Sequence, residues 1–326
     1  MKALRLFIWL VLALVLAGAS AGLESLWSNR NLPVETVDAR YSSDTSRFIH
    51  IDGVRLHVRD EGTGPPMLLI HSEFSNLIDW DPWVAAFNRD FRVIRFDLPA
   101  HGLTGPDPSG DYSLERTVSL TRKLIDALGL EKPVLIGAGA GGTVAVEYAT
   151  DYPGQVDSLI LLSPDGMTTD TLARLRDPEP AALHILQWVM PRTLVRLILA
   201  SAWGKEPGPD DGLVTRWHTL WLRDGQREAQ LQWLDQYRPD GIRNRFRDIH
   251  APGLLLWGDA DEWNRPPRPD ELDRLLTRQN WHTIVYAGKG HLLVEEADDR
   301  LLNDVGTWLE GGPPTEAAVT AVPQSP

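Results

Sequence analysis

The stretch Val134-Leu-Ile-Gly-Ala-Gly-Ala-Gly-Gly142 decides the fold of this chain. Its apolar start predicts a buried strand, its glycines a tight turn, and the residues after it a helix. The pattern G-x-S-x-G places a catalytic nucleophile at the centre of such a strand–turn–helix unit. Here the outer glycines are Gly137 and Gly141, and the central residue is Gly139. The sequence therefore predicts the turn of a covalent catalyst without its reacting side chain.

Strand and helix patterns alternate on both sides of this turn, which predicts a mostly parallel sheet. Asp52-Gly53 separates two strand-like runs and is a strong signal for a hairpin. The expected strands are residues 47–51, 54–58, 67–70, 91–96, 134–136, 156–162, 253–257 and 282–286. The expected helices in the same region are residues 113–128, 142–151, 269–278 and 297–310.

Residues 165–250 interrupt the alternation, because they contain only amphipathic helical stretches broken by Pro and Gly. An all-helical insertion between two strands is expected to form a cap over the carboxyl ends of the strands, where α/β folds bind ligands. Most tryptophans of this block should pack within the cap, and some should give the pocket an apolar, aromatic wall. They are Trp188, Trp203, Trp217, Trp221 and Trp233.

Four further motifs accompany the glycine turn. His71-Ser72-Glu73-Phe74 follows the third expected strand, and Asp97-Leu-Pro-Ala-His-Gly-Leu-Thr-Gly105 follows the fourth. Leu256-Trp-Gly-Asp-Ala-Asp261 and Gly288-Lys-Gly-His291 come after the helical block. With these motifs in this order, residues 46–310 resemble the α/β-hydrolase superfamily of the helical-cap type. The resemblance implies an eight-stranded, mostly parallel sheet with helices on both faces. Residues 46–164 and 251–310 would form the core, and residues 165–250 the cap.

The resemblance also implies roles for individual residues. His291 corresponds to the general base and Asp261 to the acid that fixes its tautomer. The oxyanion hole of the family uses backbone N–H groups, which here belong to Glu73 and Ala140. Gly139 stands at the nucleophile position, which is therefore expected to be vacant.

Two residues near the expected hole depart from the pattern or carry unusual chemistry. Ser72 stands where Gly is usual. An ionised Glu73 side chain would oppose a developing anion, whereas a Glu73 neutralised by burial would donate a proton. Ser163, at the end of a strand, is an alternative nucleophile, and Asp165 is an alternative acid.

Three functions stay open on this sequence. The first is a hydrolase-like enzyme in which His291 and Asp261 act on a small apolar ester or acyl compound, with a water held beside Gly139. The second is a non-catalytic protein that binds an apolar ligand or a partner under the cap. The third is an ordinary serine hydrolase that carries an inactivating substitution at Gly139.

Composition excludes other classes of function. The chain of 326 residues has a net charge of −13 and no basic stripe, so nucleic acid is not an expected partner. It has no cysteine, which excludes a thiol nucleophile, disulfides and Cys-ligated metals. His, Asp and Glu show no metal-ligand spacing along the chain, so neither a metal nor another cofactor is expected.

The ends of the chain carry targeting and linker signals. Lys2 and Arg5 precede an apolar run, so residues 1–23 are predicted to be a signal peptide or a signal anchor. The protein is therefore expected to be exported, either held in a membrane with its main domain outside the cytoplasm or, after cleavage, periplasmic or secreted. Residues 24–45 are expected to be a polar linker, and residues 311–326 a disordered tail.

Overall fold

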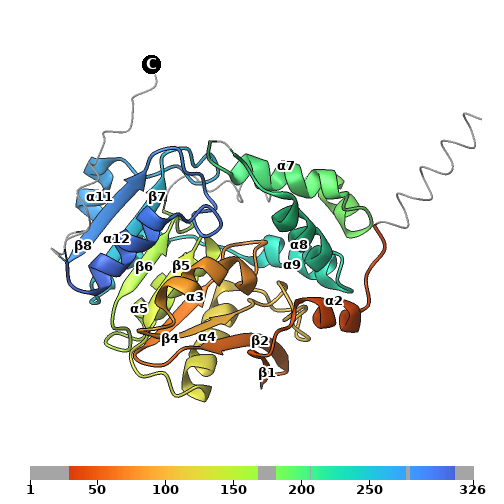
Figure 1. The fold of residues 1–326 in the computed structure, drawn as a ribbon, viewed down its shortest axis with the longest axis horizontal. Coiled ribbons are helices and arrows are strands. Elements are labelled where there is room, and N and C mark those ends of the chain that lie inside the picture. The colour runs from red at the N-terminus through yellow and green to blue at the C-terminus, as the bar shows by residue number, and fades with distance from the viewer. Residues whose placement is uncertain (1–28, 168–180, 206, 277–279, 313–326) are drawn as a thin grey trace, which may run out of the picture.

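The computed structural model describes residues 29–167, 181–205, 207–276 and 280–312 (Figure 1). The predicted signal peptide or anchor lies outside the described residues, as does the predicted tail from residue 313 onward. Within these described ranges, no helix is long and apolar enough to cross a membrane.

The predicted eight-stranded sheet is confirmed, with strand order β1-β2-β4-β3-β5-β6-β7-β8. β2 is antiparallel to β1 and β4, and the remaining neighbours are parallel. The hairpin between β1 and β2 closes at Asp52-Gly53, with Ile51 paired to Val54. The strands are β1 (Ser46–Ile51), β2 (Val54–Glu61), β3 (Pro66–Ile70), β4 (Arg92–Phe96), β5 (Val134–Ala138), β6 (Leu159–Leu162), β7 (Gly253–Gly258) and β8 (Trp281–Tyr286).

Alternate residues of the central strands feed two hydrophobic cores, one on each face of the sheet. In β3, Leu68 belongs to one core and Leu69 to the other; β5 divides Leu135 and Ile136 in the same way. This period of two, with every side chain apolar, is what a strand covered on both faces requires. The first core includes side chains of α4 (Leu114–Ala127) and α5 (Ala140–Asp151). The second includes side chains of α3 (Asp81–Phe87) and α12 (Asp299–Leu309).

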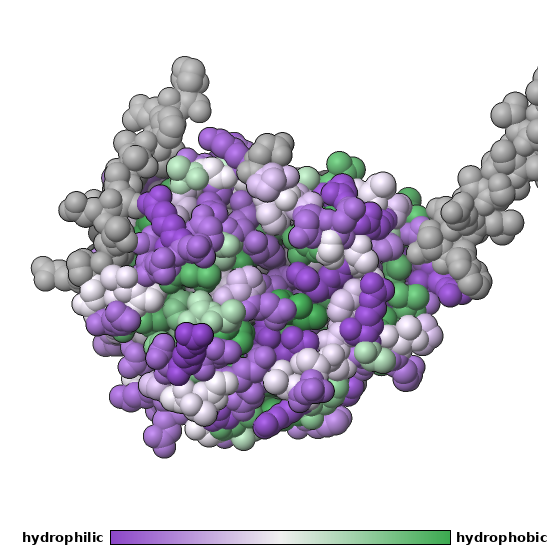
Figure 2. Space-filling model, viewed as in Figure 1, coloured by the Kyte–Doolittle hydropathy of each residue, from purple (hydrophilic) through white to green (hydrophobic). Residues whose placement is uncertain are grey.

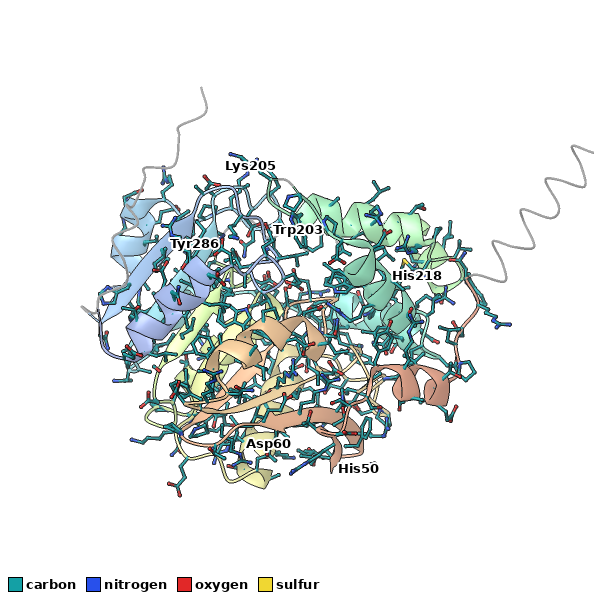
Figure 3. All side chains as sticks on the ribbon, in the orientation of Figure 1. His50, Asp60, Trp203, Lys205, His218 and Tyr286 are labelled. Atoms are coloured by element: carbon teal, nitrogen blue, oxygen red, sulfur yellow. The ribbon has the colours of Figure 1, made fainter. Side chains whose placement is uncertain are left out.

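The described elements between β6 and β7 are all helical, and α7, α8 and α9 gather at one side of the sheet (Figure 1). Three cap tryptophans, Trp217, Trp221 and Trp233, are buried, whereas Trp188 is 71% exposed. Figure 3 shows Trp203 and Lys205 on the segment after α7, and His218 on α8. These elements are η2 (Ala181–Gln187), α7 (Arg192–Ala202), α8 (Asp211–Trp221), α9 (Gln226–Gln236), α10 (Ile242–Arg245) and η3 (Phe246–Asp248), and the remaining short helices of the chain are η1 (Leu77–Trp80) and α11 (Pro269–Leu275).

One face of the molecule shows how polar and apolar side chains are distributed on the surface. The face drawn in Figure 2 is largely hydrophilic, with small hydrophobic patches between the polar side chains. The exposed large apolar side chains of the described residues are Ile185, Trp188 and Leu197, and all three belong to the helical block.

Part of the expected polar linker is instead a packed helix, α2 (Val34–Tyr41). Val37 is fully buried, and Asp38 accepts hydrogen bonds from Arg55 at 2.9 Å and from Arg223 at 3.0 Å. Since Arg55 is on β2 and Arg223 follows α8, this helix ties the core to the cap. A helix of eight residues with one fully buried side chain leaves little apolar periodicity in the sequence, which explains why it was not predicted.

A buried carboxylate, Asp79, also joins the cap to the core. It accepts hydrogen bonds from Arg216 at 2.5 Å and from Trp217 at 3.0 Å, both on α8. The same side chain accepts from Ser75 at 2.7 Å and from Asn76 at 2.7 Å, in the loop after β3. This loop begins with the His71-Ser72-Glu73 motif, so Asp79 couples the position of the motif to the position of the cap.

We expect Asp79→Ala to lower the free energy of unfolding by about 3 kcal/mol, because it leaves the Arg216 guanidinium and several polar groups without their buried partner. Chemical denaturation of the two proteins measures the difference. Asp211→Ala is the matched control, since its carboxylate pairs with Arg192 and Arg196 on the exposed side of the cap. A change for Asp79→Ala no larger than for Asp211→Ala would contradict the proposed coupling.

Candidate active site

The glycine turn has the backbone of a nucleophile elbow. Gly139 follows β5 with φ 47° and ψ −118°, a backbone conformation that is strained for any residue with a side chain. Helix α5 begins at the next residue. Its N–H donates to the carbonyl of Leu162 on β6 at 2.9 Å. A Cβ on Gly141 would overlap the carbonyl oxygen of Ile70, so the close approach of α5 to β3 also requires glycine there.

The space beside Gly139 is filled, contrary to the expected vacancy. A Cβ built on Gly139 would overlap the Oγ of Ser72 and the Oε2 of Glu73. Both side chains come from the loop after β3, which approaches the turn because glycine leaves room for it. The water that the sequence suggested for this place has a carboxylate there instead.

The Glu73 carboxylate is held by three donors around the turn. Its Oε2 accepts from the backbone N–H of Ala140 at 3.1 Å and from the Ser72 hydroxyl at 2.6 Å. Its Oε1 lies 2.9 Å from Nε2 of His291. Glu73 is 2% exposed, so these contacts replace water almost completely. The Ala140 N–H, expected in the oxyanion hole, therefore already binds an anionic oxygen.

His291 lies between two carboxylates. Its Nδ1 is 2.9 Å from Oδ2 of Asp261, while Nε2 faces Glu73. Oδ1 of Asp261 accepts from the backbone N–H groups of Trp263 at 3.0 Å and Asn264 at 2.7 Å, which fixes the carboxylate after β7. The backbone N–H of His291 donates to Ala202 at the end of α7 at 2.7 Å, so the cap also positions this loop.

The side chains of Asp261, His291 and Glu73 contact one another in this order, and their charges favour an ionised Glu73 beside a protonated His291. Burial alone raises the pKa of Glu73, but the charge of His291 and hydrogen bonds from His291, Ser72 and the Glu73 backbone lower it to about 2. Burial alone lowers the pKa of His291, but the carboxylates of Asp261 and Glu73 hold it well above its ordinary value. A doubly protonated imidazole donates to both neighbours at once, as the two distances require.

Asp165, after β6, completes a cluster that the sequence did not reveal. One carboxylate oxygen each from Glu73 and Asp165 and a ring nitrogen of His291 all lie within 4.8 Å of one another. Among the residues that the structure describes, these three form the group with the geometry to hold a metal ion. In the sequence, 218 positions separate Glu73 from His291. Spacing along the chain gave no sign of this group, because its residues follow β3, β6 and β8, and only the folded sheet brings the segments after these strands together.

Ser163 does not take the place of the missing nucleophile. Its hydroxyl is fully buried and has no hydrogen-bond partner among the described residues. Both nitrogens of His291 are bonded to Glu73 and Asp261, so the base that would activate a serine is engaged elsewhere.

Aromatic side chains of the cap reach the loop that carries Glu73. The ring of Phe74 lies 5.7 Å from that of Trp221 and 5.8 Å from that of Trp233, both edge-on. Trp221 also donates to the Phe74 carbonyl at 3.1 Å. His101, from the D-x-P-x-H-G loop, stacks edge-on against Trp233 at 5.2 Å, and burial, with His71 nearby, lowers its pKa to about 3. The surroundings of Glu73 on the cap side are thus aromatic and hold a neutral imidazole.

Glu73→Gln should reduce stability in a defined pH window. The lowered pKa of Glu73 contributes stability that is complete above pH 4.5 and is lost as the pH falls toward 2. The raised pKa of His291 contributes stability that is complete below pH 6.5 and is lost as the pH rises through the elevated value. Both contributions are complete between these limits, so we expect a loss there of about 1.5–3 kcal/mol in the free energy of unfolding.

Denaturation of wild type and Glu73→Gln at a series of pH values measures this loss. Glu262→Gln serves as the control, because its exposed pair with Arg265 should have little effect at any pH. A deficit that stays constant from acid to alkaline pH would show that Glu73 does not form the charged pair with His291.

Comparison with known proteins agrees with this fold. Residues 65–202 match the family model of the alpha/beta hydrolase fold. An uncharacterized protein of Mycobacterium tuberculosis is 37% identical over 142 residues, which are 43% of this chain and 40% of the relative, so the match spans about two fifths of that protein. A 2-hydroxy-6-oxo-2,4-heptadienoate hydrolase of Pseudomonas putida is 27% identical over 81% of this chain and 96% of its own length. An alpha/beta hydrolase fold protein of Burkholderia ambifaria superposes with a TM-score of 0.70 at 21% identity, covering 81% of this chain and 98% of that chain.

The sheet order, the elbow and the histidine after the last strand together define a hydrolase-type fold. The chain has the α/β-hydrolase fold, and the proteins similar to it include hydrolases.

Proposed function

We propose that this protein is a hydrolase of a small apolar ester or acyl compound that works through His291 and Asp261 without a nucleophile at Gly139. The observation that carries the proposal is the buried His291–Asp261 pair, 2.9 Å apart, beside the backbone N–H of Ala140. A base with a fixed tautomer next to an N–H donor for an oxyanion is what acyl hydrolysis needs. The aromatic contacts of Phe74 with the cap support an apolar substrate.

The pKa of His291 sets the pH dependence of such an enzyme. Held above its ordinary value of 6.5, the imidazole must lose a proton before it can accept one from water. The rate should therefore rise with pH above neutrality and level off beyond the elevated pKa. For an acyl substrate, the carbonyl oxygen must also displace Oε2 of Glu73 from the Ala140 N–H.

A non-catalytic binding protein is the second candidate. The observation in its favour is that the Glu73 carboxylate occupies both the nucleophile space and the Ala140 N–H. In that case Glu73 would close the former active site, and ligand binding would take place elsewhere under the cap.

The third candidate, a serine hydrolase with a single inactivating change, has less support. A Cβ on Gly139 would overlap two neighbouring side chains, Ser72 and Glu73, so the surroundings are adapted to glycine. Restoring serine alone would not restore the space that serine needs.

The test is hydrolysis of p-nitrophenyl acetate and p-nitrophenyl butyrate by the purified full-length protein, compared with His291→Ala. If the protein is an enzyme, it should hydrolyse the esters faster than buffer does, and His291→Ala should hydrolyse them at the buffer rate. Absence of hydrolysis, together with equal binding of an apolar dye by both proteins, would favour the binding protein.

A further inference from the structure

We propose that the Glu73 carboxylate has taken over the covalent role of the missing elbow side chain, and that it attacks a saturated carbon that bears a leaving group. The carboxylate reaches the nucleophile position from the loop after β3 instead of from the elbow. This inference rests on the proposed function for one step only, because the same His291–Asp261 pair would hydrolyse the ester formed on Glu73.

The position of Glu73 satisfies the geometric requirements of a nucleophile. Its Oε2 lies where the first side-chain atoms of residue 139 would stand. Its Oε1 contacts Nε2 of His291, which is the contact that an elbow serine makes with its base. The lowered pKa keeps it ionised, and its burial removes the water shell that weakens a carboxylate as a nucleophile.

The two oxygens of the carboxylate are suited to different tasks. Oε2 is fixed by the Ser72 hydroxyl and the Ala140 N–H, so it is placed to remain the carbonyl oxygen of an ester. Oε1 contacts His291 and, among the described residues, no backbone donor holds it, so it is the oxygen that can form a new bond. A covalent step on Oε1 would leave the oxyanion donor already in position for the next step.

In the first step Oε1 of Glu73 forms a bond to the substrate carbon while the bond from that carbon to the leaving group breaks. The bonding pair departs with the leaving group, and the product is an alkyl ester of Glu73. The ester has no charge, so His291 loses one of the two carboxylates that raise its pKa and releases a proton to solvent. Formation of the intermediate therefore converts His291 from a cation to a base.

In the second step the neutral His291 takes a proton from water as the water oxygen bonds to Cδ of Glu73. The negative charge develops on Oε2, where the Ala140 N–H and Ser72 hydroxyl stabilise it. The intermediate collapses with loss of the alkoxide, which takes the proton from His291, and the regenerated Glu73 acid returns its proton to His291. For a halide or sulfonate, the net reaction consumes the substrate and one water and yields an alcohol, the leaving-group anion and a proton. For an epoxide, the leaving oxygen stays attached to the product and takes this proton, so the product is a diol.

A carboxylate nucleophile selects its substrate class. Attack on an acyl ester would form a mixed anhydride, which is about as reactive as the substrate or more so. Attack on a saturated carbon forms an ordinary ester, which accumulates and needs the base for its removal. We therefore infer an apolar alkyl halide, alkyl sulfonate or epoxide as the substrate class of this step.

The experiment traps the ester in His291→Gln, which keeps a side chain of similar length but cannot accept the proton. The full-length protein is incubated with 1-bromobutane or 1,2-epoxybutane, and the peptides are mapped by mass spectrometry. We expect the Glu73 ester in His291→Gln at least about tenfold above its level in wild type, where it turns over. Wild type turning over in ¹⁸O-water should carry ¹⁸O in the Glu73 carboxylate.

Two variants make the outcome specific. Glu73→Gln/His291→Gln should show no adduct at position 73, whereas Glu295→Gln/His291→Gln should be labelled like His291→Gln, because the half-buried Glu295 lies outside the cluster. Circular dichroism of each variant verifies that it is folded. Absence of a Glu73 adduct in folded His291→Gln, or labelling unaffected by Glu73→Gln, would overturn the inference.

This result is separable from that of the proposed function. Loss of p-nitrophenyl ester hydrolysis in His291→Ala without any Glu73 adduct would support the acyl hydrolase and overturn the covalent role. A Glu73 adduct and ¹⁸O incorporation in a protein that does not hydrolyse acyl esters would support the covalent role and overturn the acyl hydrolase.

Discussion

Replacement of His291 by alanine is expected to reduce p-nitrophenyl ester hydrolysis by about 10²–10⁴-fold, to the level of buffer or slightly above it. The His291 ring contacts both Asp261 and Glu73, so its loss removes the base and separates the two carboxylates. The remaining N–H of Ala140 can stabilise an oxyanion but cannot move a proton.

The comparison variants distinguish a catalytic effect from loss of structure. Asp261→Asn keeps the shape of the site but presents the wrong hydrogen-bond partner to Nδ1, so we expect a loss of about 10²–10⁴-fold with KM nearly unchanged. His50→Ala, on the exposed side of β1 (Figure 3), should retain the wild-type rate. Retention of the wild-type rate by folded His291→Ala would refute a catalytic function of this site for acyl esters.

The core fold was predictable because its determinants are local. The apolar run before Gly137, the hairpin at Asp52-Gly53 and the strand before Asp261 each occupy a few consecutive residues, and the structure has strands at all three. The predicted ends of helices and strands were less accurate. The strand expected at residues 156–162 begins at Leu159, and the helix expected from Gly142 begins at Ala140. Tertiary packing sets such ends, so local patterns fix them poorly.

The content of the site was less predictable because it depends on side chains far apart in the sequence. Motifs named His291, Asp261 and Ala140, and the fold brings these three to one place. They did not indicate that Glu73 would cover Gly139, since that depends on the direction of one side chain 66 positions away. A signal was present, however: Ser72 and Gly139 both depart from the family pattern, and in the structure the first fills the space that the second leaves.

Gly139→Ser alone is expected to yield an unstable protein that does not react with a fluorophosphonate probe. The left-handed φ of 47° costs a residue with a side chain about 1–3 kcal/mol. Overlap of the new Cβ with Ser72 and Glu73 adds a similar amount, unless both side chains move. Even a folded variant would hold the serine beside a carboxylate that already occupies Nε2 of His291, so the hydroxyl would lack its base.

The triple variant Ser72→Gly/Glu73→Ala/Gly139→Ser should instead be labelled by the probe, at least about a hundredfold faster than Gly139→Ser. Removing the two side chains opens the elbow, frees Nε2 of His291 and leaves the Ala140 N–H to receive an oxyanion. Active-site peptide mapping should place the label on residue 139. If Gly139→Ser alone is labelled as fast as the triple variant, Glu73 does not compete for the nucleophile position. If neither folded protein is labelled, the His291–Asp261 pair is not competent to activate a serine, and the site has diverged beyond the elbow itself.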